Sequence, residues 1–462
     1  MESYNDFVKK KQIKNGHYGF YYPRDNMTPL LFNYQKDLVM WSLRKGKSAL
    51  FTMTGTGKTY MEIEFSRIVF NEKKINSLIV APLAVSEQII EIARENFNIT
   101  VHKVKDEGSV NGISIINYDA LHMINAKNYG CIVLDESSIL KSYSGKIRNS
   151  IIDMFVDYPY KLAATATPSP NDYMELGNHA EFLDVMKRRE MLAMYFIHDG
   201  AETAKWRLKK HAEELFWEWV ATWAAVMNMP SDLGYSDDGF ILPKLNEQLV
   251  KIKTGMHFGN GFFSLPANTL SERREARRGT IDNKVEWIRN KVESNNDTFL
   301  IWCDLNDESK AISNAINGSV EITGSDTDTH KSENMLAFAK GKIRCLVTKP
   351  KIAGFGMNWQ VCHNVIFCGL SDSFEQYFQA VRRCWRFGQK QQVNVWIVTT
   401  DVENKTLENI KRKEEETENM YVQMKNKVSE YLIKDLKEQD IDCSKYMPRI
   451  NMVLPVWLQE KV

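Results

Sequence analysis

Ten short apolar runs, arranged in two blocks of five, constrain the fold of this chain most strongly. The first block lies within residues 28–170, the second within 281–400, and helical patterns separate the runs. Most runs are rich in Val, Ile and Leu, as are strands buried on both faces of a parallel sheet. They read SALFTM, SLIVAP, ISIINY, CIVLDE and KLAATAT, then TFLIWC, SVEITG, IRCLVT, NVIFCG and NVWIVT. The sequence therefore predicts two α/β lobes, each built on a parallel sheet.

The stretch between the two blocks has a different composition. Residues 171–280 show no strand-like run and are rich in Met, Trp, Glu, Lys and Arg. Within HAEELFWEWVATWAAVMNM, five side chains recur at helical spacing: Leu215, Trp219, Thr222, Trp223 and Val226. Such an aromatic stripe is more often core packing than a ligand site. We therefore expect a mainly helical insertion here, between a first lobe at 1–170 and a second lobe at 281–420. A helical, then irregular, tail is expected at 421–462.

Charge and cysteine usage exclude several classes of protein. Lys and Arg total 60 against 59 Asp and Glu, so bulk charge does not signal nucleic acid and any basic surface must be local. The N-terminus has no apolar core of a secretory signal, and no run approaches the roughly 18–20 apolar residues of a membrane span. The seven cysteines are dispersed without a C-x-x-C pair, which favours buried thiols over a zinc site. We expect a cytoplasmic protein.

The stretch MTGTGKTY has the local context of a phosphate-binding loop. It follows the run SALFTM and precedes the helical pattern MEIEFSRIVF. Glycines let backbone amides approach a β-phosphate at a helix N-terminus, where Lys58 can reach the β and γ oxygens and Thr59 can bind Mg²⁺. The eight-residue form of the motif is absent, because Thr52 stands where its first glycine would be. The predicted nucleotide-binding residues are Thr54, Gly55, Thr56, Gly57, Lys58 and Thr59.

Two carboxylates end the run CIVLDESS, and Asp135 lies 77 residues after Lys58. An isolated Asp-Glu pair at the end of a strand is usually a polar loop. A phosphate loop upstream favours a functional interpretation, in which Asp135 holds Mg²⁺ through water and Glu136 activates the attacking water.

The stretch QAVRRCWRFGQK gathers basic residues near the end of the second block. Read as a helix, it places Gln379, Arg383 and Arg386 at i, i+4 and i+7, which is one face. A solvated basic face is the ordinary interpretation of such a run. The alternative is a set of side chains that contact a phosphate.

Together these motifs resemble those of superfamily 2 helicases, in the branch that contains the Swi/Snf-type DNA translocases. The resemblance is closest to compact phage-encoded members and runs from about Leu30 to Leu407. LFNYQKDLV resembles the adenine-reading Q motif, with Gln35 as the reader, and QAVRRCWRFGQ fits every position of motif VI. The remaining matches are IVAPLAVSEQIIEIARENF and IINYDAL for motifs Ia and Ib, ATATPSPND for motif III, VEITGS for motif IVa and LVTKPKIAGFGMNWQ for motif V, with Gly354, Gly356 and Asn358 in its core.

The resemblance implies two RecA-like lobes that hold ATP and Mg²⁺ between them. It implies that Arg383 and Arg386 reach across the cleft to the γ-phosphate, where guanidinium groups stabilise the charge of phosphoryl transfer. Gln379 would contact the γ-phosphate or the attacking water, and Gly356 would belong to the nucleotide site. Asp135 and Thr59 would be the magnesium ligands.

The resemblance also implies nucleic acid bound across both lobes. The candidate contacts are Pro82, Asn117, Tyr118, Thr348 and Lys349. Such contacts are mostly to phosphates, which position a strand without reading its sequence. The stretches MKRRE and KWRLKK are further candidate basic patches, although each alone is more often a solvated helix face. Trp206 would either stack on a base or pack in the core.

Two departures from the family pattern bear on function. Motif II reads DESS, so Ser137 and Ser138 replace the pair that usually relays nucleotide state to motif III, and we expect them to bond Thr165 or Thr167. Motif V carries KPKIAG in place of a shorter, Gly-rich approach, which affects its nucleic-acid contacts.

The function expected from the sequence is an ATP-dependent DNA helicase or translocase, acting as a monomer in phage DNA replication, recombination or repair. Its DNA would be single-stranded, forked or duplex, and replication or recombination proteins are possible partners. One alternative is a duplex translocase that remodels protein–DNA complexes without separating strands. A non-hydrolysing nucleic-acid scaffold and a metabolic P-loop kinase are the others. The presence of Lys58, Glu136 and Arg386 argues against the scaffold, and motif VI argues against the kinase.

Overall fold

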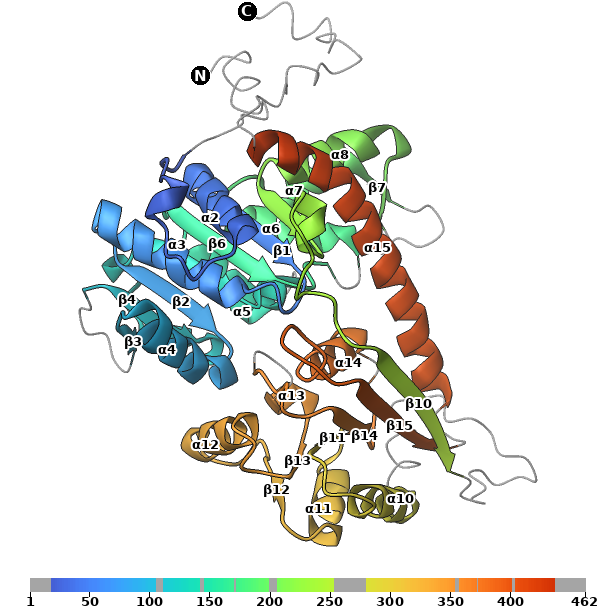
Figure 1. The fold of residues 1–462 in the computed structure, drawn as a ribbon. Coiled ribbons are helices and arrows are strands. Elements are labelled where there is room, and N and C mark those ends of the chain that lie inside the picture. Colours follow the sequence, from blue (N-terminus) through green and yellow to red (C-terminus); the bar gives the residue numbers. More distant parts are fainter. Residues whose placement is uncertain are drawn as a thin grey trace, which may run out of the picture.

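The computed structural model describes residues 18–104, 111–141, 145–169, 172–198, 206–252, 280–353, 357–371, 373–400 and 404–436. It contains two α/β lobes, each built on a parallel sheet, and a long C-terminal helix that lies along both (Figure 1). The predicted fold class is confirmed. Among the described residues, no helix combines the length and the apolar character needed to cross a membrane. Gly356, one of the predicted nucleotide-binding residues, lies outside the described residues.

The first lobe is built on a seven-stranded parallel sheet with the order β3-β4-β2-β5-β6-β1-β9. All five apolar runs of the first block are strands in this sheet, as predicted. The short strand Val101–Lys103 and one strand from the inserted region complete it. The bounds are β1 Lys47–Thr52, β2 Ser77–Ala81, β3 Val101–Lys103, β4 Ile113–Asn117, β5 Cys131–Asp135, β6 Tyr160–Thr165 and β9 Ala224–Met227.

Helices cover both faces of this sheet, which is why its strands are apolar on both sides. Along β1, Leu50 packs into one core, whereas Ala49 and Phe51 pack into the other. The first core is covered by α2 (Asn33–Lys45), α3 (Lys58–Lys73) and α4 (Leu83–Phe97). The second is covered by α5 (Lys146–Met154), α6 (Leu176–Phe182), α7 (Arg188–Tyr195) and α8 (Glu213–Ala221).

Residues 171–280 show no strand-like run in the sequence, yet their described part contains strands. Strand β9 pairs with β1 in the first sheet, and β10 (Leu245–Ile252) pairs with β15 in the second. A small hairpin of β7 (Phe196–His198) and β8 (Trp206–Leu208) precedes both of these strands in sequence. The run AAVM of β9 is short and alanine-rich, and β10 is an edge strand with mostly polar or exposed residues. Pairing with an existing sheet overrides such weak local preferences.

The helix around Trp219 is shorter than the helical spacing of the sequence predicted. Helix α8 ends at Ala221, so Trp223 and Val226 lie beyond it, and Val226 belongs to β9. The predicted role in the core is confirmed for both indoles: Trp219 and Trp223 are buried, with ring centroids 5.4 Å apart. Trp206 also packs against this core, which is the structural alternative to stacking on a base.

The second lobe is built on a six-stranded sheet with the order β10-β15-β14-β11-β13-β12. All five runs of the second block are strands in it, as predicted. The strands are β11 Phe299–Trp302, β12 Ser319–Glu321, β13 Cys345–Thr348, β14 Asn364–Phe367 and β15 Val393–Thr400. The helices are α10 Ile281–Glu293, α11 Asn306–Ala315, α12 Asp328–Ala339, α13 Pro350–Ala353 and α14 Phe374–Val381.

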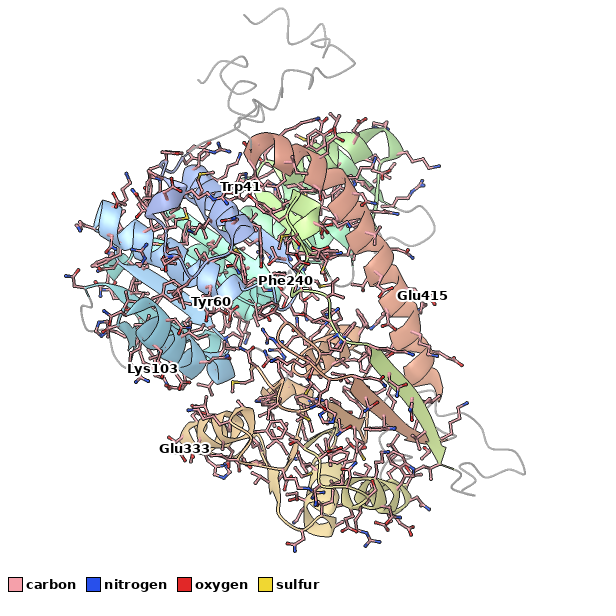
Figure 2. The ribbon with its side chains drawn as sticks, in the orientation of Figure 1. Trp41, Tyr60, Lys103, Phe240, Glu333 and Glu415 are labelled. Atoms are coloured by element: carbon pink, nitrogen blue, oxygen red, sulfur yellow. The ribbon has the colours of Figure 1, made fainter. Side chains whose placement is uncertain are left out.

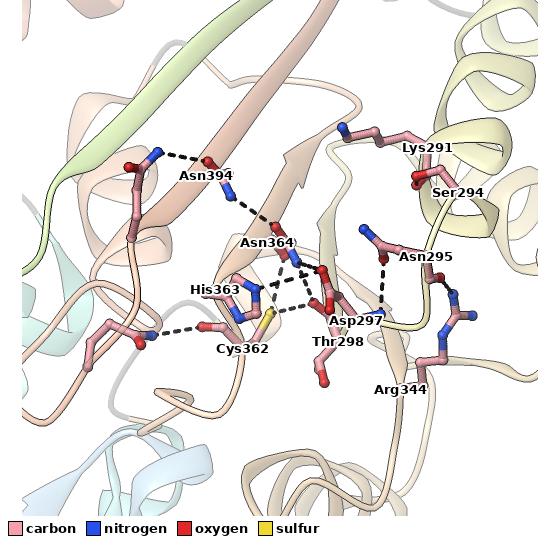
Figure 3. Close-up of polar contacts among 12 residues, drawn as sticks. Lys291, Ser294, Asn295, Asp297, Thr298, Arg344, Cys362, His363, Asn364 and Asn394 are labelled. Atoms are coloured by element: carbon pink, nitrogen blue, oxygen red, sulfur yellow. Dashed lines mark hydrogen bonds and ion pairs between the residues drawn. The ribbon is translucent and has the colours of Figure 1, made fainter.

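A line of asparagines joins three strands of this sheet at their N-terminal ends, and Figure 3 shows two of them, Asn364 and Asn394. Asn246 donates to Asn394 at 3.0 Å, and Asn394 donates to Asn364 at 3.2 Å. The same three residues are paired in the registers of β10, β15 and β14. Because side chains alternate along a strand, this line fixes which residues of β10 face the lobe.

Helix α15 (Asn404–Leu436) leaves the second lobe and returns to the first. Tyr421 donates its hydroxyl to the Phe51 carbonyl of β1 at 2.9 Å. Near its end, Asp435 accepts the indole N–H of Trp41 at 2.7 Å and pairs with Lys45 at 2.8 Å. The helical character of the tail is confirmed, and the helix runs unbroken through residue 420, where a boundary was predicted.

Candidate active site

The phosphate loop connects β1 to the N-terminus of α3, in the strand–loop–helix context that was predicted. Gly55 and Gly57 have φ angles of 88° and 80°, a region in which side chains are strained. A Cβ on Gly55 would lie 2.9 Å from the Phe387 nitrogen of the second lobe, and one on Gly57 would lie 2.2 Å from the Gln35 amide nitrogen. Both positions therefore require glycine.

Lys58 begins α3 and is buried beneath the loop. Its ammonium donates to the carbonyls of Thr52 at 2.7 Å and Met53 at 3.1 Å. Burial lowers the pKa of Lys58, while Glu136 and Asp135 act in the opposite direction. A phosphate in the loop would offer this ammonium a charged acceptor, which is a stronger partner than a carbonyl.

The two carboxylates of motif II leave the end of β5, beside the loop. Burial, and then the neighbouring Glu136, raise the pKa of Asp135 to about 7. Glu136 has a φ of 56° and accepts the Thr165 hydroxyl at 3.4 Å. Neighbouring buried carboxylates are stabilised by a nearby cation, and carboxylate and hydroxyl oxygens are the ligands that Mg²⁺ prefers. Asp135 and Thr59 line one cavity, so their placement fits the predicted magnesium site.

The arginines of motif VI follow the C-terminal end of α14, in the second lobe. Arg383 is 1% exposed and donates to the Gln379 side-chain oxygen at 2.8 Å, while Arg386 donates to the Met357 carbonyl at 3.3 Å. Burial, then the charge of Arg383, lower the pKa of Arg386 to about 9. Both guanidiniums are electrostatically coupled to Asp135 and Glu136 of the first lobe.

The expectation of a helix through Arg386 is wrong, although the side chains still converge. Helix α14 ends at Val381, and the chain continues in turns. The Arg383 carbonyl accepts the Trp359 N–H at 2.9 Å and not an N–H of the next helical turn. This bond stabilises the turn. Gln379, which is buried, orients Arg383 from the last turn of the helix.

A cavity of about 410 Å³ joins these groups between the lobes. From the first lobe it is lined by Thr54, Gly55, Gly57, Lys58, Thr59, Asp135 and Glu136, and from the second by Asn358, Gln360, Arg383, Arg386 and Phe387. Of the other predicted residues, Thr56 bonds within the loop through its hydroxyl, and Gln379 stands behind Arg383. The structure thus brings together, at one site, motifs separated by more than 300 residues in sequence.

One end of the cavity is aromatic, a feature that the sequence interpretation missed. Phe32, Phe240 and Phe387 come from three separate segments, and the rings of Phe240 and Phe387 lie 4.7 Å apart. Figure 2 shows Phe240 at the junction of the lobes. Phe32 and Phe387 stand inside the quoted Q motif and motif VI, which was a usable signal. Phe240 follows β9 in the inserted region, and no sequence motif marked it as a residue of the site.

Gln35 also lines this end of the cavity. Its side-chain oxygen accepts the Phe32 N–H at 2.8 Å, and its nitrogen donates to the Thr56 carbonyl at 2.8 Å. The amide therefore ties the first helix of the lobe to the phosphate loop. Its reading of adenine stays a prediction.

A second interlobe cleft, of about 860 Å³, is lined by three of the five predicted nucleic-acid contacts, Pro82, Asn117 and Tyr118. The other two lie elsewhere: Thr348 is buried and donates to the Ile322 carbonyl at 3.0 Å, and Lys349 bonds Asn306. Cations that were not predicted line the cleft instead, namely Lys141, Lys146, Arg148, Lys331 and Lys351.

The serines of motif II differ from the expectation. The Ser137 hydroxyl lies 3.1 Å from the ring nitrogen Nε2 of buried His179, not at Thr165 or Thr167. It is Glu136 that contacts Thr165. The six described cysteines are all buried free thiols, as predicted; Cys443 lies outside the described residues.

Two family models match the chain, one in each lobe. Residues 28–170 match the family described as type III restriction enzyme, res subunit, and residues 283–388 match the helicase conserved C-terminal domain. These two matches, with the cavity between them, decide the family. The chain has the core of a superfamily 2 helicase. A search of curated proteins by sequence finds no match.

Two solved structures share the fold of this helicase core at low sequence identity, and a third matches it with a TM-score below 0.5. A fragment described as the HsdR subunit of a type I restriction enzyme from Vibrio vulnificus YJ016 is 14% identical, with a TM-score of 0.53 over 84% of this chain and 68% of that one. S. cerevisiae Dbp5 bound to RNA and ADP BeF3 is 12% identical, with a TM-score of 0.54 over 87% and 93%. The Sulfolobus solfataricus SWI2/SNF2 ATPase core in complex with dsDNA is 17% identical, with a TM-score of 0.41 over 89% and 96%.

Proposed function

We propose that this protein is a DNA-dependent ATPase that moves along DNA as a helicase or translocase. The observation that carries the proposal is the cavity between the lobes. It places the phosphate-loop residue Lys58 and the carboxylate Glu136 of one lobe opposite Arg386 of the other. A site divided in this way is complete only when the lobes are together, so hydrolysis can be tied to lobe movement.

In this mechanism each lobe supplies part of the chemistry. The loop amides and Lys58 hold the β- and γ-phosphates, and Glu136 accepts a proton from the attacking water. Mg²⁺, held by Thr59 and Asp135, would neutralise the phosphate oxygens. Arg383 and Arg386 stabilise the charge that spreads over the γ-phosphate.

The second cleft supports nucleic acid as the partner. It runs between the lobes beside the ATP site, since Glu136 lines both cavities. Five cationic side chains from both lobes line it, against three carboxylates, Asp119, Glu136 and Glu375. Cations in a groove bind phosphates without reading bases. We assign the protein to the Swi/Snf-type branch on its motif VI sequence. We assign it to a phage function in DNA replication, recombination or repair on its resemblance to compact phage-encoded members of that branch.

The test is the ATPase rate measured side by side with single-stranded DNA, duplex DNA, a forked substrate and RNA. We expect DNA to stimulate hydrolysis, and Lys58→Ala to abolish it. Stimulation by duplex without unwinding of the fork would favour the duplex translocase. Stimulation by RNA alone would refute the DNA assignment. Undiminished turnover in Lys58→Ala would place the active site elsewhere.

A further inference from the structure

Glu375 is a carboxylate of the second lobe that is buried against the first. It lies in the first turn of α14, one helical turn before Gln379, and is 4% exposed. Two residues of the first lobe bind it. Thr167 donates its hydroxyl to Glu375 at 3.3 Å, and the ammonium of Lys141 forms an ion pair with it.

Hydrogen bonds continue from this contact to the carboxylate of motif II. The backbone N–H of Thr167 donates to the Thr165 hydroxyl oxygen at 3.1 Å. The Thr165 hydroxyl in turn donates to the Glu136 side chain at 3.4 Å. Thr165 and Thr167 are both buried, so water does not compete freely for these bonds. Glu375 is thus linked to Glu136 through two threonines.

We propose that Glu375 is a positioning residue for Glu136, and that it acts only when the two lobes are together. The proposal rests on the proposed function, in which Glu136 is the general base. Separation of the lobes breaks the bonds of Glu375 to Thr167 and Lys141, because Glu375 alone lies on the second lobe. Closure restores them and fixes the threonines that hold Glu136. Hydrolysis is thereby restricted to the closed state.

The same contact borders the cleft that we assign to nucleic acid. Lys141 and Glu375 both line that cleft, together with Glu136. Lys141 is 37% exposed, so its ammonium is accessible to a strand while paired with the buried carboxylate. A strand that holds the lobes together therefore stabilises the contact that orients the base.

A purely structural role for Glu375 would be to hold α14 in place. The chain offers a matched control, because Glu247 of β10 accepts the hydroxyl of Tyr377 on the same helix. That bond lies within the second lobe and does not cross the cleft. Glu247→Gln therefore changes a carboxylate that holds α14 without touching the interlobe contact.

The experiment compares Glu375→Gln, Thr167→Val and Glu247→Gln with wild type, using full-length protein. The kcat and KM for ATP are measured with and without a single-stranded oligonucleotide, beside DNA affinity and thermal melting. We expect Glu375→Gln and Thr167→Val to lower the DNA-stimulated kcat by about tenfold to a hundredfold, as small misplacements of a catalytic group do. The KM for ATP should stay unchanged. The double variant should be no slower than the slower single variant, because both changes break one path.

Two outcomes would overturn the inference alone. In one, Glu375→Gln and Thr167→Val turn over like wild type while Lys58→Ala is inactive, so the proposed function stands without this path. In the other, Glu247→Gln loses as much kcat as Glu375→Gln, which assigns the effect to helix packing. Hydrolysis in wild type without DNA stimulation would refute the DNA dependence instead, and the inference would then be judged on the unstimulated kcat. A wild-type protein that hydrolyses no ATP would refute both.

Discussion

At the scale of single residues, the arginines of motif VI reach the interlobe cavity from turns that follow α14, which ends at Val381. The sequence interpretation had placed Gln379, Arg383 and Arg386 on one helix. The spacing still predicted that the three side chains lie close together. Tight turns, like a helix, bring residues a few positions apart onto the same side of the chain. What the sequence could not show is burial: Arg383 is almost fully enclosed, by segments far away in the chain.

Glu136→Gln tests the general base. The amide keeps the shape of the side chain but cannot accept a proton, so we expect kcat to fall by about 10²- to 10⁴-fold. ATP affinity should persist, because Lys58 and Asp135 remain. The measurement is single-turnover hydrolysis beside nucleotide binding. Turnover near the wild-type rate would remove Glu136 from this role.

Phe387→Ala tests the aromatic end of the cavity. Its ring lies beside Phe240 at the site where the base of ATP would be placed, and Gln35 already bonds the loop. Loss of a stacking ring should raise the KM for ATP by about tenfold, in line with the effect of removing an aromatic that stacks on a base. Hydrolysis of inorganic tripolyphosphate, which has no base, should change little. An equal loss with both substrates would mean that the ring supports the loop and not the base.

At the scale of elements, the ten apolar runs were all strands, because a strand buried on both faces needs a continuous apolar sequence. Three strands of the two large sheets were missed, and each lacks that signature: β3 has only three residues, β9 is alanine-rich, and β10 is a polar edge. These three segments become strands because they pair with strands that are distant in sequence. For the same reason the sequence predicted a helical tail but not its contacts with the first lobe.

The end of α15 is fastened to α2 by Asp435, and Asp435→Asn tests that contact. The change removes the carboxylate charge that pairs with the buried ammonium of Lys45. Breaking a buried ion pair costs about 3 kcal/mol or more, so the free energy of unfolding should fall by that order. Glu430→Gln on the same helix is the control, because the pair with Lys434 is exposed and should contribute nothing measurable. Chemical denaturation of the three proteins gives the answer, and equal stability would show that α15 is not held here.

At the scale of the whole molecule, near-neutral net charge coexists with a cationic cleft between the lobes. DNA binding should therefore be largely independent of sequence and strongly dependent on salt. Each phosphate neutralised adds about −0.7 to −0.9 to the slope of log affinity against log salt. Lys351→Gln, in the cleft, should make the slope shallower by about the contribution of one phosphate contact. Lys310→Gln, on α11 and outside the cleft lining, is the control and should leave the slope unchanged. Tight, salt-insensitive binding to one sequence would contradict this assignment.

We predict that DNA activates hydrolysis by favouring closure, because the candidate active site is divided between the lobes. A strand bound across both lobes favours the closed state, in which Arg386 faces the phosphates held by Lys58. A guanidinium supplied from another domain is worth roughly 10³- to 10⁵-fold in rate, so Arg386→Ala should lose most DNA-stimulated hydrolysis. Arg386→Lys should recover little, because a point charge does not reproduce a planar fork.

ATP affinity should fall much less than turnover in both arginine variants, since the guanidinium acts mainly in the transition state. Steady-state ATPase with and without DNA, beside nucleotide affinity, separates the two effects. Because Arg386 donates to the Met357 carbonyl within its own lobe, thermal melting controls for loss of that contact. Arg386→Ala could instead melt like wild type and keep full DNA-stimulated turnover. That result would show that the cationic face of motif VI contributes packing and not catalysis. The lobes would then communicate by another route, and the interlobe cavity would no longer be the site where DNA controls hydrolysis.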